Sequence, residues 1–167
     1  MNEKWDRRFL ELAKHISTWS KDPSTQVGAV IATDDRRVVG MGYNGFAGGV
    51  MDSPERYADR QLKYKMVVHA EVNAILQAGP KAKGATIYVY PSFWEPNICH
   101  DCAKFAIQAG IKAVVGYDYD PNNPRAASWR ESIELAGMMF KEAGVEWYQI
   151  SLSPFPPIKR EDLMEVI

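Results

Sequence analysis

The stretch VGAVIATDDRRVVGMGY (27–43) indicates the fold class of the chain. Two runs rich in valine and isoleucine, at 27–32 and 37–43, are typical of strands, and the polar residues between them favour a turn. The stretch therefore predicts an antiparallel hairpin.

Downstream of this hairpin, predicted strands and helices alternate. Further strands are expected at 85–90, 113–117 and 145–150, after helices that begin at His69, at the cysteines and at Ser128. Gly79-Pro80, Gly110 and Gly144 are expected to end these helices, and Ser128 with Glu131 forms an S-x-x-E capping box. Such alternation predicts parallel strands, so we expect an α/β protein with a mixed five-stranded sheet in a three-layer α/β/α sandwich.

Apolar residues at helical spacing predict which helix faces point inward. The first helix is expected to end at Lys21-Asp22-Pro23, and residues 54–66 form either a helix or an irregular connection. The residues expected inward are Trp5, Phe9, Leu12, Ile16 and Trp19, then Val72, Ile75 and Leu76, then Phe105, Ala106 and Ala109, and finally Trp129, Ile133, Ala136 and Phe140.

Composition is that of one ordinary folded domain. The chain has 167 residues, of which 46% are hydrophobic and 25% charged, which excludes a disordered or low-complexity protein. We expect a single domain at 1–153 followed by a proline-rich tail at 154–167. The formal net charge of −1 offers no basic footprint for a nucleic acid, so a small-molecule substrate is favoured.

Targeting signals and disulfides are not predicted. No apolar run reaches the roughly 20 residues of a membrane span, and the start MNEKWDRRFLELAKH alternates charged and hydrophobic residues. We therefore expect a cytoplasmic protein with no membrane partner. The 2 cysteines, Cys99 and Cys102, are a redox pair or half of a metal site, and they exclude a disulfide-stapled scaffold.

Two predicted strand-to-helix junctions carry the reactive residues. His69 with Cys99 and Cys102 would supply one imidazole and two thiolates, a set that suits tetrahedral zinc and leaves a fourth position open for water. Predicted helix N-termini at both junctions favour the thiolates. Glu71, two residues past the histidine, is placed to reach that water without binding the metal.

Each residue also has a plainer interpretation. A C-x-x-C pair alone could be a redox couple, a lone histidine could belong to the core, and Glu71 could be an ordinary charge at a helix start. The joint pattern H-x-E followed by C-x-x-C is that of zinc deaminases, and it favours zinc. His100 is an alternative ligand, but we expect its side chain to point away from that of Cys99, and we expect His15 to lie on the surface.

From about Trp5 to Gln149, the sequence resembles the deoxycytidylate (dCMP) deaminase family, within the cytidine and deoxycytidylate deaminase zinc-binding superfamily. The stretches SKDPSTQVGAVI (20–31), GYNGFAGG (42–49), DSPERY (52–57) and VVHAEVNAIL (67–76) are similar to family segments in the same order. The resemblance implies a cytidine deaminase-like sheet, bound zinc, and hydrolysis of dCMP to dUMP and ammonia. Glu71 would carry the proton from water to ring N3 and to the leaving amine.

The resemblance also implies substrate contacts. Backbone groups around Ala70 would hold the base, and Asn44 would contact the sugar, with a turn residue of left-handed conformation as the less favoured alternative for Asn44. Lys21, Ser24 and Thr25 are candidates for the 5′-phosphate, with a helix C-terminal cap as the alternative. Tyr117 and Tyr119 would stack on the base or serve as core aromatics.

Three departures from the family pattern bear on specificity and control. Ile98 replaces the proline before the first cysteine and the stretch 91–97 is longer than usual, which would alter the substrate accepted, for example to a 5-substituted dCMP. Ala47-Gly48 stands where a Pro-Arg often follows, which argues against the dCTP and dTTP effectors of some members. No other cysteine is available for a second zinc. The family precedent implies a homo-oligomer.

Two rival functions remain open at this point. One is deamination of another base, such as guanine, a riboflavin-pathway pyrimidine or a tRNA adenosine. The other is a non-catalytic nucleotide-binding regulatory module with structural zinc, against which Glu71 argues because a structural site needs no proton carrier.

Overall fold

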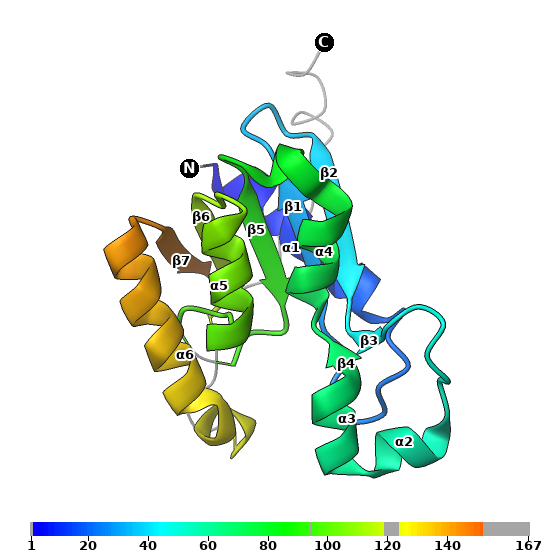
Figure 1. Ribbon diagram of the computed structural model, residues 1–167. Helices are drawn as coiled ribbons and strands as arrows, with labels where there is room; N and C mark the ends of the chain where they lie inside the picture. Colours follow the sequence, from blue (N-terminus) through cyan, green and yellow to red (C-terminus); the bar gives the residue numbers. More distant parts are fainter. Residues whose placement is uncertain (1, 94, 119–123, 152–167) are drawn as a thin grey trace.

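The predicted mixed sheet is present. This computed structural model describes residues 2–93, 95–118 and 124–151, with only the backbone at 124–126. The strands run in the order β2-β1-β5-β6-β7, and β1 is antiparallel to both neighbours while β5, β6 and β7 are parallel (Figure 1). Their bounds are β1 Gly28–Ala32, β2 Val38–Tyr43, β5 Thr86–Tyr90, β6 Ala113–Tyr117 and β7 Glu146–Ile150.

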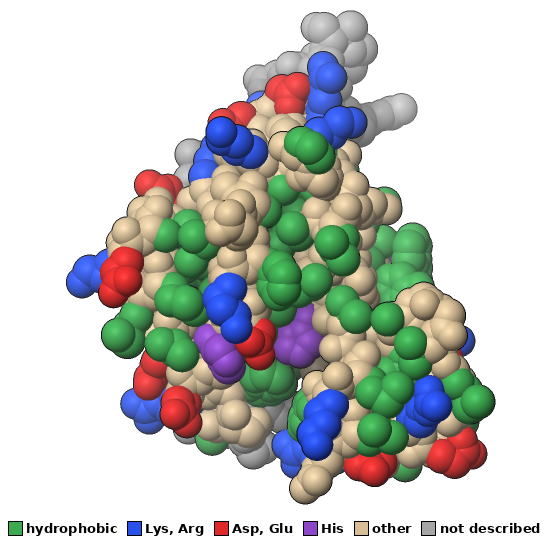
Figure 2. All heavy atoms as spheres, viewed as in Figure 1, with side chains coloured by type: hydrophobic (Ala, Val, Ile, Leu, Met, Phe, Trp, Pro, Cys, Tyr) green, Lys and Arg blue, Asp and Glu red, His purple; other side chains and the backbone are tan. Residues whose placement is uncertain are grey.

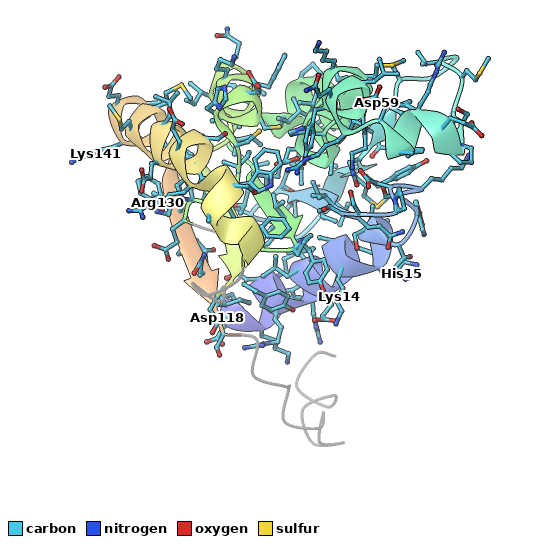
Figure 3. The ribbon with its side chains drawn as sticks, turned by 90° about the horizontal axis from the view of Figure 1, so that it is seen from below. Lys14, His15, Asp59, Asp118, Arg130 and Lys141 are labelled. Atoms are coloured by element: carbon cyan, nitrogen blue, oxygen red, sulfur yellow. The ribbon has the colours of Figure 1, made fainter. Side chains whose placement is uncertain are left out.

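Helices cover both faces of the sheet, as the sequence predicts. Helix α1 (Glu3–Ser17) packs on one face against Val30 and Tyr88, while α4 (Ala70–Ala78), α5 (His100–Gln108) and α6 (Pro124–Ala143) cover the other. Figure 3 shows the sheet between α1 and the opposite helical layer. Strand residues alternate between the two cores, with Ile31 facing α4 and Val30 facing α1.

The end of the first helix differs from the prediction. Helix α1 ends at Ser17, so Trp19 lies beyond it and is 51% exposed, whereas Leu10 is fully buried. The hydroxyl groups of Ser17 and Thr18 donate hydrogen bonds to the carbonyls of Lys14 and His15, and these local bonds replace continued helix.

Two residues predicted to face inward are exposed instead. Leu76 is 71% exposed and Phe105 is 51% exposed. The face of α4 against β2 is made of Ala70, Ala74 and Ala78, because the helix approaches so closely that a Cβ at Gly42 would lie 2.3 Å from the Ala70 carbonyl oxygen. Leu76 is not part of this alanine face and is exposed to solvent instead.

Helix α6 begins four residues before the predicted capping box. It starts at Pro124, a favoured first helical residue, so Ser128 and Glu131 lie inside the helix and do not cap it. Its end agrees with the prediction, since Gly144 follows with a positive φ of 72°.

The segment between the hairpin and His69 contains elements that the sequence left open or did not reveal. Residues 54–66 form two short helices, α2 (Pro54–Ala58) and α3 (Arg60–Met66). Strand β3 (Gly45–Phe46) pairs antiparallel with β4 (Val67–Val68), which leads directly to His69. A short 3-10 helix, η1 (Gly79–Ala82), follows α4. No helix of the described residues is long and apolar enough to cross a membrane.

Candidate metal centre and active site

Two helix N-termini bring the candidate metal ligands together. His69 is the residue before α4 and Cys99 is the residue before α5, both with extended backbone, and Cys102 lies in the first turn of α5. The amide of Cys102 donates a hydrogen bond to the Cys99 sulfur, 3.5 Å away. Both helix dipoles therefore favour negative charge at this point.

The three predicted ligands form a compact cluster. The Nδ1 atom of His69 lies 3.3 Å from Sγ of Cys99 and 3.2 Å from Sγ of Cys102. The ligand atoms all lie within 4.8 Å of one another, and both cysteines are buried. One imidazole nitrogen and two thiolate sulfurs at this spacing fit a single zinc ion.

The electrostatics of the cluster favour a bound cation. A hydrogen bond with Cys102 and contact with His69 lower the pKa of Cys99 to about 4 against the effect of burial. The hydrogen bond with Cys99 raises the pKa of His69 to about 9, and the hydrogen bond with Cys99 together with burial raises the pKa of Cys102. Because cysteine binds a metal as the thiolate and histidine as the neutral imidazole, a bound cation would release the protons that these side chains hold.

Glu71 lies in the first turn of α4, beside the cluster. Its side chain is only 5% exposed. Burial, followed by the nearby charge of Cys99, raises the pKa of this carboxyl to about 7, although His69 opposes the rise. A carboxyl group with a pKa near neutrality can both accept and release a proton, as a general acid and base must.

The cluster and Glu71 open into a pocket with mostly apolar walls. Ala70 and Glu71 line one side. Contact of the Ala70 backbone with a base stays a prediction. The other walls come from Val67, Phe93, Ile98, Trp129 and Ile133.

Trp129 was predicted only as a core residue, yet its ring lies 6.1 Å from the ring of His69 and 6.2 Å from that of Tyr64, both edge-on. Its role in the pocket depends on how α6 packs against α3 and α5, which no local sequence signal records.

Asn44 lines this pocket and binds the segment before β1, which also lines the pocket. Its Oδ1 atom accepts a hydrogen bond from the amide of Val27 at 2.7 Å, and its Nδ2 atom donates to the carbonyl of Thr25 at 2.9 Å. The left-handed turn interpretation is wrong, because Arg36 is the one non-glycine residue with positive φ among those described. A contact between Asn44 and a sugar stays a prediction.

The structure separates one of the three predicted phosphate contacts from the other two. Thr25 lines both the pocket and a neighbouring groove, and Ser24 lines that groove. Lys21 is exposed, lies outside the pocket lining and pairs with Asp52 at 2.7 Å. The role of all three toward a phosphate stays a prediction.

A different lysine, Lys63 of α3, lines the pocket. Its Nζ atom lies 3.1 Å from each carboxylate oxygen of Asp22 and 2.5 Å from Oγ of Ser24. Both charged side chains are nearly inaccessible, at 7% and 4% exposure. Sequence reasoning missed this pair because Lys63 lies in the segment 54–66, where periodicity is weak.

The remaining histidines lie outside the cluster. His100 Nδ1 lies 2.7 Å from the Ser132 hydroxyl, so the expectation that it points away from the metal ligands is confirmed. His15 is exposed, as expected, with its ring edge-on to Trp19.

The two tyrosine predictions have different outcomes. Tyr117 is a core aromatic on the α1 side of the sheet, where its hydroxyl donates to Glu11 at 2.6 Å. Tyr119 lies outside the described residues, as does the tail at 154–167.

Comparisons with known proteins agree with this site. Residues 3–117 match the family described as "Cytidine and deoxycytidylate deaminase zinc-binding region". The chain is 42% identical over 148 residues to an Aliivibrio fischeri protein named "Uncharacterized deaminase in luxG 3'region", covering 87% of this chain and 93% of that one. It is 36% identical over 148 residues to human deoxycytidylate deaminase, covering 83% and 79% of the two chains.

A solved structure shares the fold. The apo dCMP deaminase of cyanophage S-TIM5 aligns with a TM-score of 0.64 over 90% of this chain and 100% of the phage protein, at 21% identity. The match to the family covers all three candidate metal ligands and Glu71. The chain therefore belongs to the cytidine and deoxycytidylate deaminase zinc-binding family.

Proposed function

We propose that this protein is a zinc-dependent deaminase that hydrolyses dCMP, or a 5-substituted dCMP, to dUMP and ammonia. The observation that carries the proposal is the buried carboxyl of Glu71 beside three ligand atoms that lie within 4.8 Å of one another. A purely structural metal site would not need a buried carboxyl group beside it. The similarity to human deoxycytidylate deaminase supports the choice of substrate.

The protein's own residues supply binding and proton transfer in this reaction. His69, Cys99 and Cys102 would hold zinc, which supplies a water whose pKa falls from about 15.7 to near 7. Glu71 accepts a proton from the attacking water, delivers it to ring N3 and assists protonation of the leaving amine. One water is consumed, the C4–N bond breaks, and ammonia leaves as the C4 carbonyl forms.

The pocket walls fit a pyrimidine ring. Phe93, Trp129 and Ile133 give apolar surfaces for the faces of a base, and the N-terminal amides of α4 beside Ala70 offer hydrogen-bond donors. Asn44 lies in the wall where it could meet the sugar.

The substituent at ring position 5 depends on the loop before Cys99. Ile98, where the family pattern has proline, is buried at 2% exposure and lines the pocket. The side chain of Asn97 donates hydrogen bonds to the carbonyls of Val89 and Pro91 and accepts one from the amide of Phe93, so it ties these three described residues together. This loop is where a preference for a 5-substituted dCMP would arise.

The proposal also covers the oligomeric state, the cellular location and the regulation of the protein. We propose a cytoplasmic homo-oligomer without dCTP or dTTP control. Large apolar side chains at the surface support association: Trp19, Met51, Leu76, Phe105 and Met138 are each at least half exposed. Light scattering after gel filtration should give a multiple of the 18.8 kDa chain mass, and a monomer would contradict the assembly.

A substrate panel tests the function. Zinc-loaded protein is offered dCMP, 5-hydroxymethyl-dCMP, dCTP, deoxycytidine and guanine, and ammonia release is followed. We expect the highest kcat/KM with one of the two monophosphates. Preference for guanine would move the protein to another base, and no turnover of any substrate with zinc bound would favour the non-catalytic regulatory module.

A further inference from the structure

A groove of about 500 Å³ lies at the end of the sheet opposite the candidate active site. This distal groove is lined by the first residues of β5, β6 and β7, whereas the pocket beside the metal cluster is lined by Val89 and Pro91 at the other end of β5. The two share no lining residue. Figure 1 shows the start of α1 at the end with the groove, and in the same view Figure 2 shows histidine side chains toward the other end, beside the notch between α3 and α6.

Aromatic side chains form much of the wall of the distal groove. Trp5 and Phe9 of α1 line it with ring centres 5.8 Å apart, and the ring centre of Tyr88 of β5 lies 5.0 Å from that of Phe9. Tyr148 of β7 completes this part of the lining. Walls of this kind suit the apolar body of a small organic molecule, and aromatic rings also attract a cation.

The carboxyl group of Asp6 lies at the floor of the distal groove. Asp6 lines the groove although it is only 5% exposed. Its Oδ1 atom accepts a hydrogen bond from the Tyr88 hydroxyl at 2.8 Å, whereas its Oδ2 atom is buried and has no hydrogen-bond partner among the described residues. Burial raises the pKa of Tyr148, and the charge of Asp6 and the interaction of its carboxyl with the hydroxyl raise it further, so both phenols face this carboxyl.

No cation of the described residues neutralises Asp6. None of the described ion pairs includes it. Of the two cationic residues in the groove lining, Lys112 is paired with Asp34, and the guanidinium of Arg36 lies 4.8 Å from the centre of the Trp5 ring. A buried carboxylate without a cation is costly, and a ligand that supplies the cation relieves this cost.

A second carboxylate, that of Glu146, lies at the mouth of the distal groove. Glu146 is exposed, and none of the described ion pairs includes it. Side chains two residues apart on a strand share a face, so Glu146 and Tyr148 face the groove together. The described lining therefore holds three carboxylates against two cationic side chains, an excess of negative charge that complements a cation.

We propose that the distal groove is a second ligand site, which binds a small primary amine in its protonated form with the ammonium group on Asp6 and the apolar body along the aromatic wall. The N–H groups of an ammonium supply the donor that Oδ2 lacks, and the soft terminal torsion of an aspartate lets the carboxyl turn toward them. Such charge-assisted hydrogen bonds are about twice as strong as neutral ones. The site is separate from the metal cluster and does not depend on the proposed deaminase activity.

Three probes with the same body test the chemistry of the ligand. Phenethylamine, phenethyl alcohol and phenylacetate differ only in a terminal group that is cationic, neutral or anionic. Nuclear magnetic resonance titration of isotope-labelled, zinc-loaded protein gives the Kd of each probe and the backbone amides that it perturbs. We expect the amine to bind at least tenfold more tightly than the alcohol, phenylacetate to bind more weakly than both, and the perturbed amides to lie at the start of α1 and in β7.

Two variants test the role of Asp6. Asp6→Asn keeps the shape of the side chain and removes its charge, so we expect the affinity for phenethylamine to fall at least tenfold. Asp34→Asn is the matched control, because it removes the same charge from the lining at a residue that Lys112 already neutralises, and the affinity should change less than threefold. Both variants should keep the zinc content and the dCMP turnover of the wild type.

Each outcome supports or overturns the site. Equal affinity for the amine and the alcohol, tighter binding of phenylacetate, or perturbed amides only around the metal cluster would overturn it. Unchanged amine affinity in Asp6→Asn, or an equal loss in Asp34→Asn, would remove Asp6 from the site. If Asp6→Asn does not fold, the probe series on the wild type decides alone. A wild type that binds the amine in this groove but deaminates nothing would contradict the proposed function and not this inference.

Discussion

At the scale of single residues, Glu71 is the clearest sign of catalysis. It is buried next to sulfur and imidazole ligands, where a permanent negative charge is costly. Its position two residues after His69 places it in the first turn of α4, on the pocket side of the cluster. The carboxyl is therefore available to a bound substrate and is not used to build the fold.

Replacement of this carboxyl should separate metal binding from turnover. We expect Glu71→Gln to keep the zinc content of the wild type and to lower kcat about 10³-fold, because proton transfer is lost while all three metal ligands remain. Zinc analysis and dUMP formation are measured on the same sample. Full activity in this variant would rule out the proposed proton carrier.

The buried ion pair between Lys63 and Asp22 is expected to stabilise the fold. Lys63→Met would leave the Asp22 carboxylate buried without its partner, so we expect a loss of about 3 kcal/mol in the free energy of unfolding. The control is Lys65→Met, an exposed lysine of the same helix, which should change stability by less than about 0.5 kcal/mol. Similar urea midpoints for the two variants would refute the structural role of the pair.

The lowered pKa of the Asp22 carboxyl predicts that the stability of the fold depends on pH. Burial is the largest single influence on the pKa of Asp22 and raises it, but hydrogen bonds from Ser24, Lys63 and Thr25 together hold the pKa below 3.8. Because the folded-state pKa is the lower one, this stabilisation is present above the unfolded-state pKa and is lost as the pH falls through the folded-state pKa. Asp22→Asn should therefore lose less stability than the wild type between about pH 5 and pH 2.

The reactive residues could be predicted from the sequence, but the buried side chains around them could not. His69, Glu71, Cys99 and Cys102 could be found because their chemical types are rare and their spacing is diagnostic. Lys63 could not, since a lysine in a charged segment looks like surface and its burial results from a contact 41 positions away along the chain.

At the scale of elements, the approach of α4 to β2 positions the site. A Cβ at Gly42 would lie 2.3 Å from the Ala70 carbonyl oxygen and 2.5 Å from the Ala74 amide. Glycine is therefore required on the strand for α4 to lie so close. Because His69 and Glu71 stand at the start of this helix, its placement sets theirs.

A single methyl group tests this dependence. Gly42→Ala should push α4 outward, lower stability by about 2 kcal/mol and weaken zinc binding. Gly48→Ala is the matched control, because a Cβ there meets nothing within 4 Å and both properties should stay unchanged. Thermal unfolding and a zinc competition assay measure the two effects. Wild-type zinc affinity in Gly42→Ala would show that the ligands do not depend on this contact.

Elements were predictable where a pattern is local. The five main strands follow from runs of β-branched residues, and their alternation with helices gave the mixed sheet and its layers. The ends of the helices were less predictable. Side-chain hydroxyl groups set the end of α1, and a proline sets the start of α6. The two-residue strands β3 and β4 carry no periodic signal, and their pairing exists only once the chain has folded.

In the whole molecule, one face of the sheet carries an aromatic core and the other face carries the candidate active site. The α1 face holds aromatic residues such as Tyr88 and Tyr117 in a core, while the opposite face carries α4 and α5 with the metal ligands at their N-termini. The pocket lies at one end of the sheet and opens both toward α1 and toward α3 and α6.

One zinc ion held by His69, Cys99 and Cys102 should support dCMP deamination. The most direct measurement removes the metal with a chelator, titrates zinc back and follows dUMP formation at each step. We expect no activity without metal and a linear rise that ends at about one zinc ion per chain. Activity that is independent of zinc, or that needs a second equivalent, would contradict it.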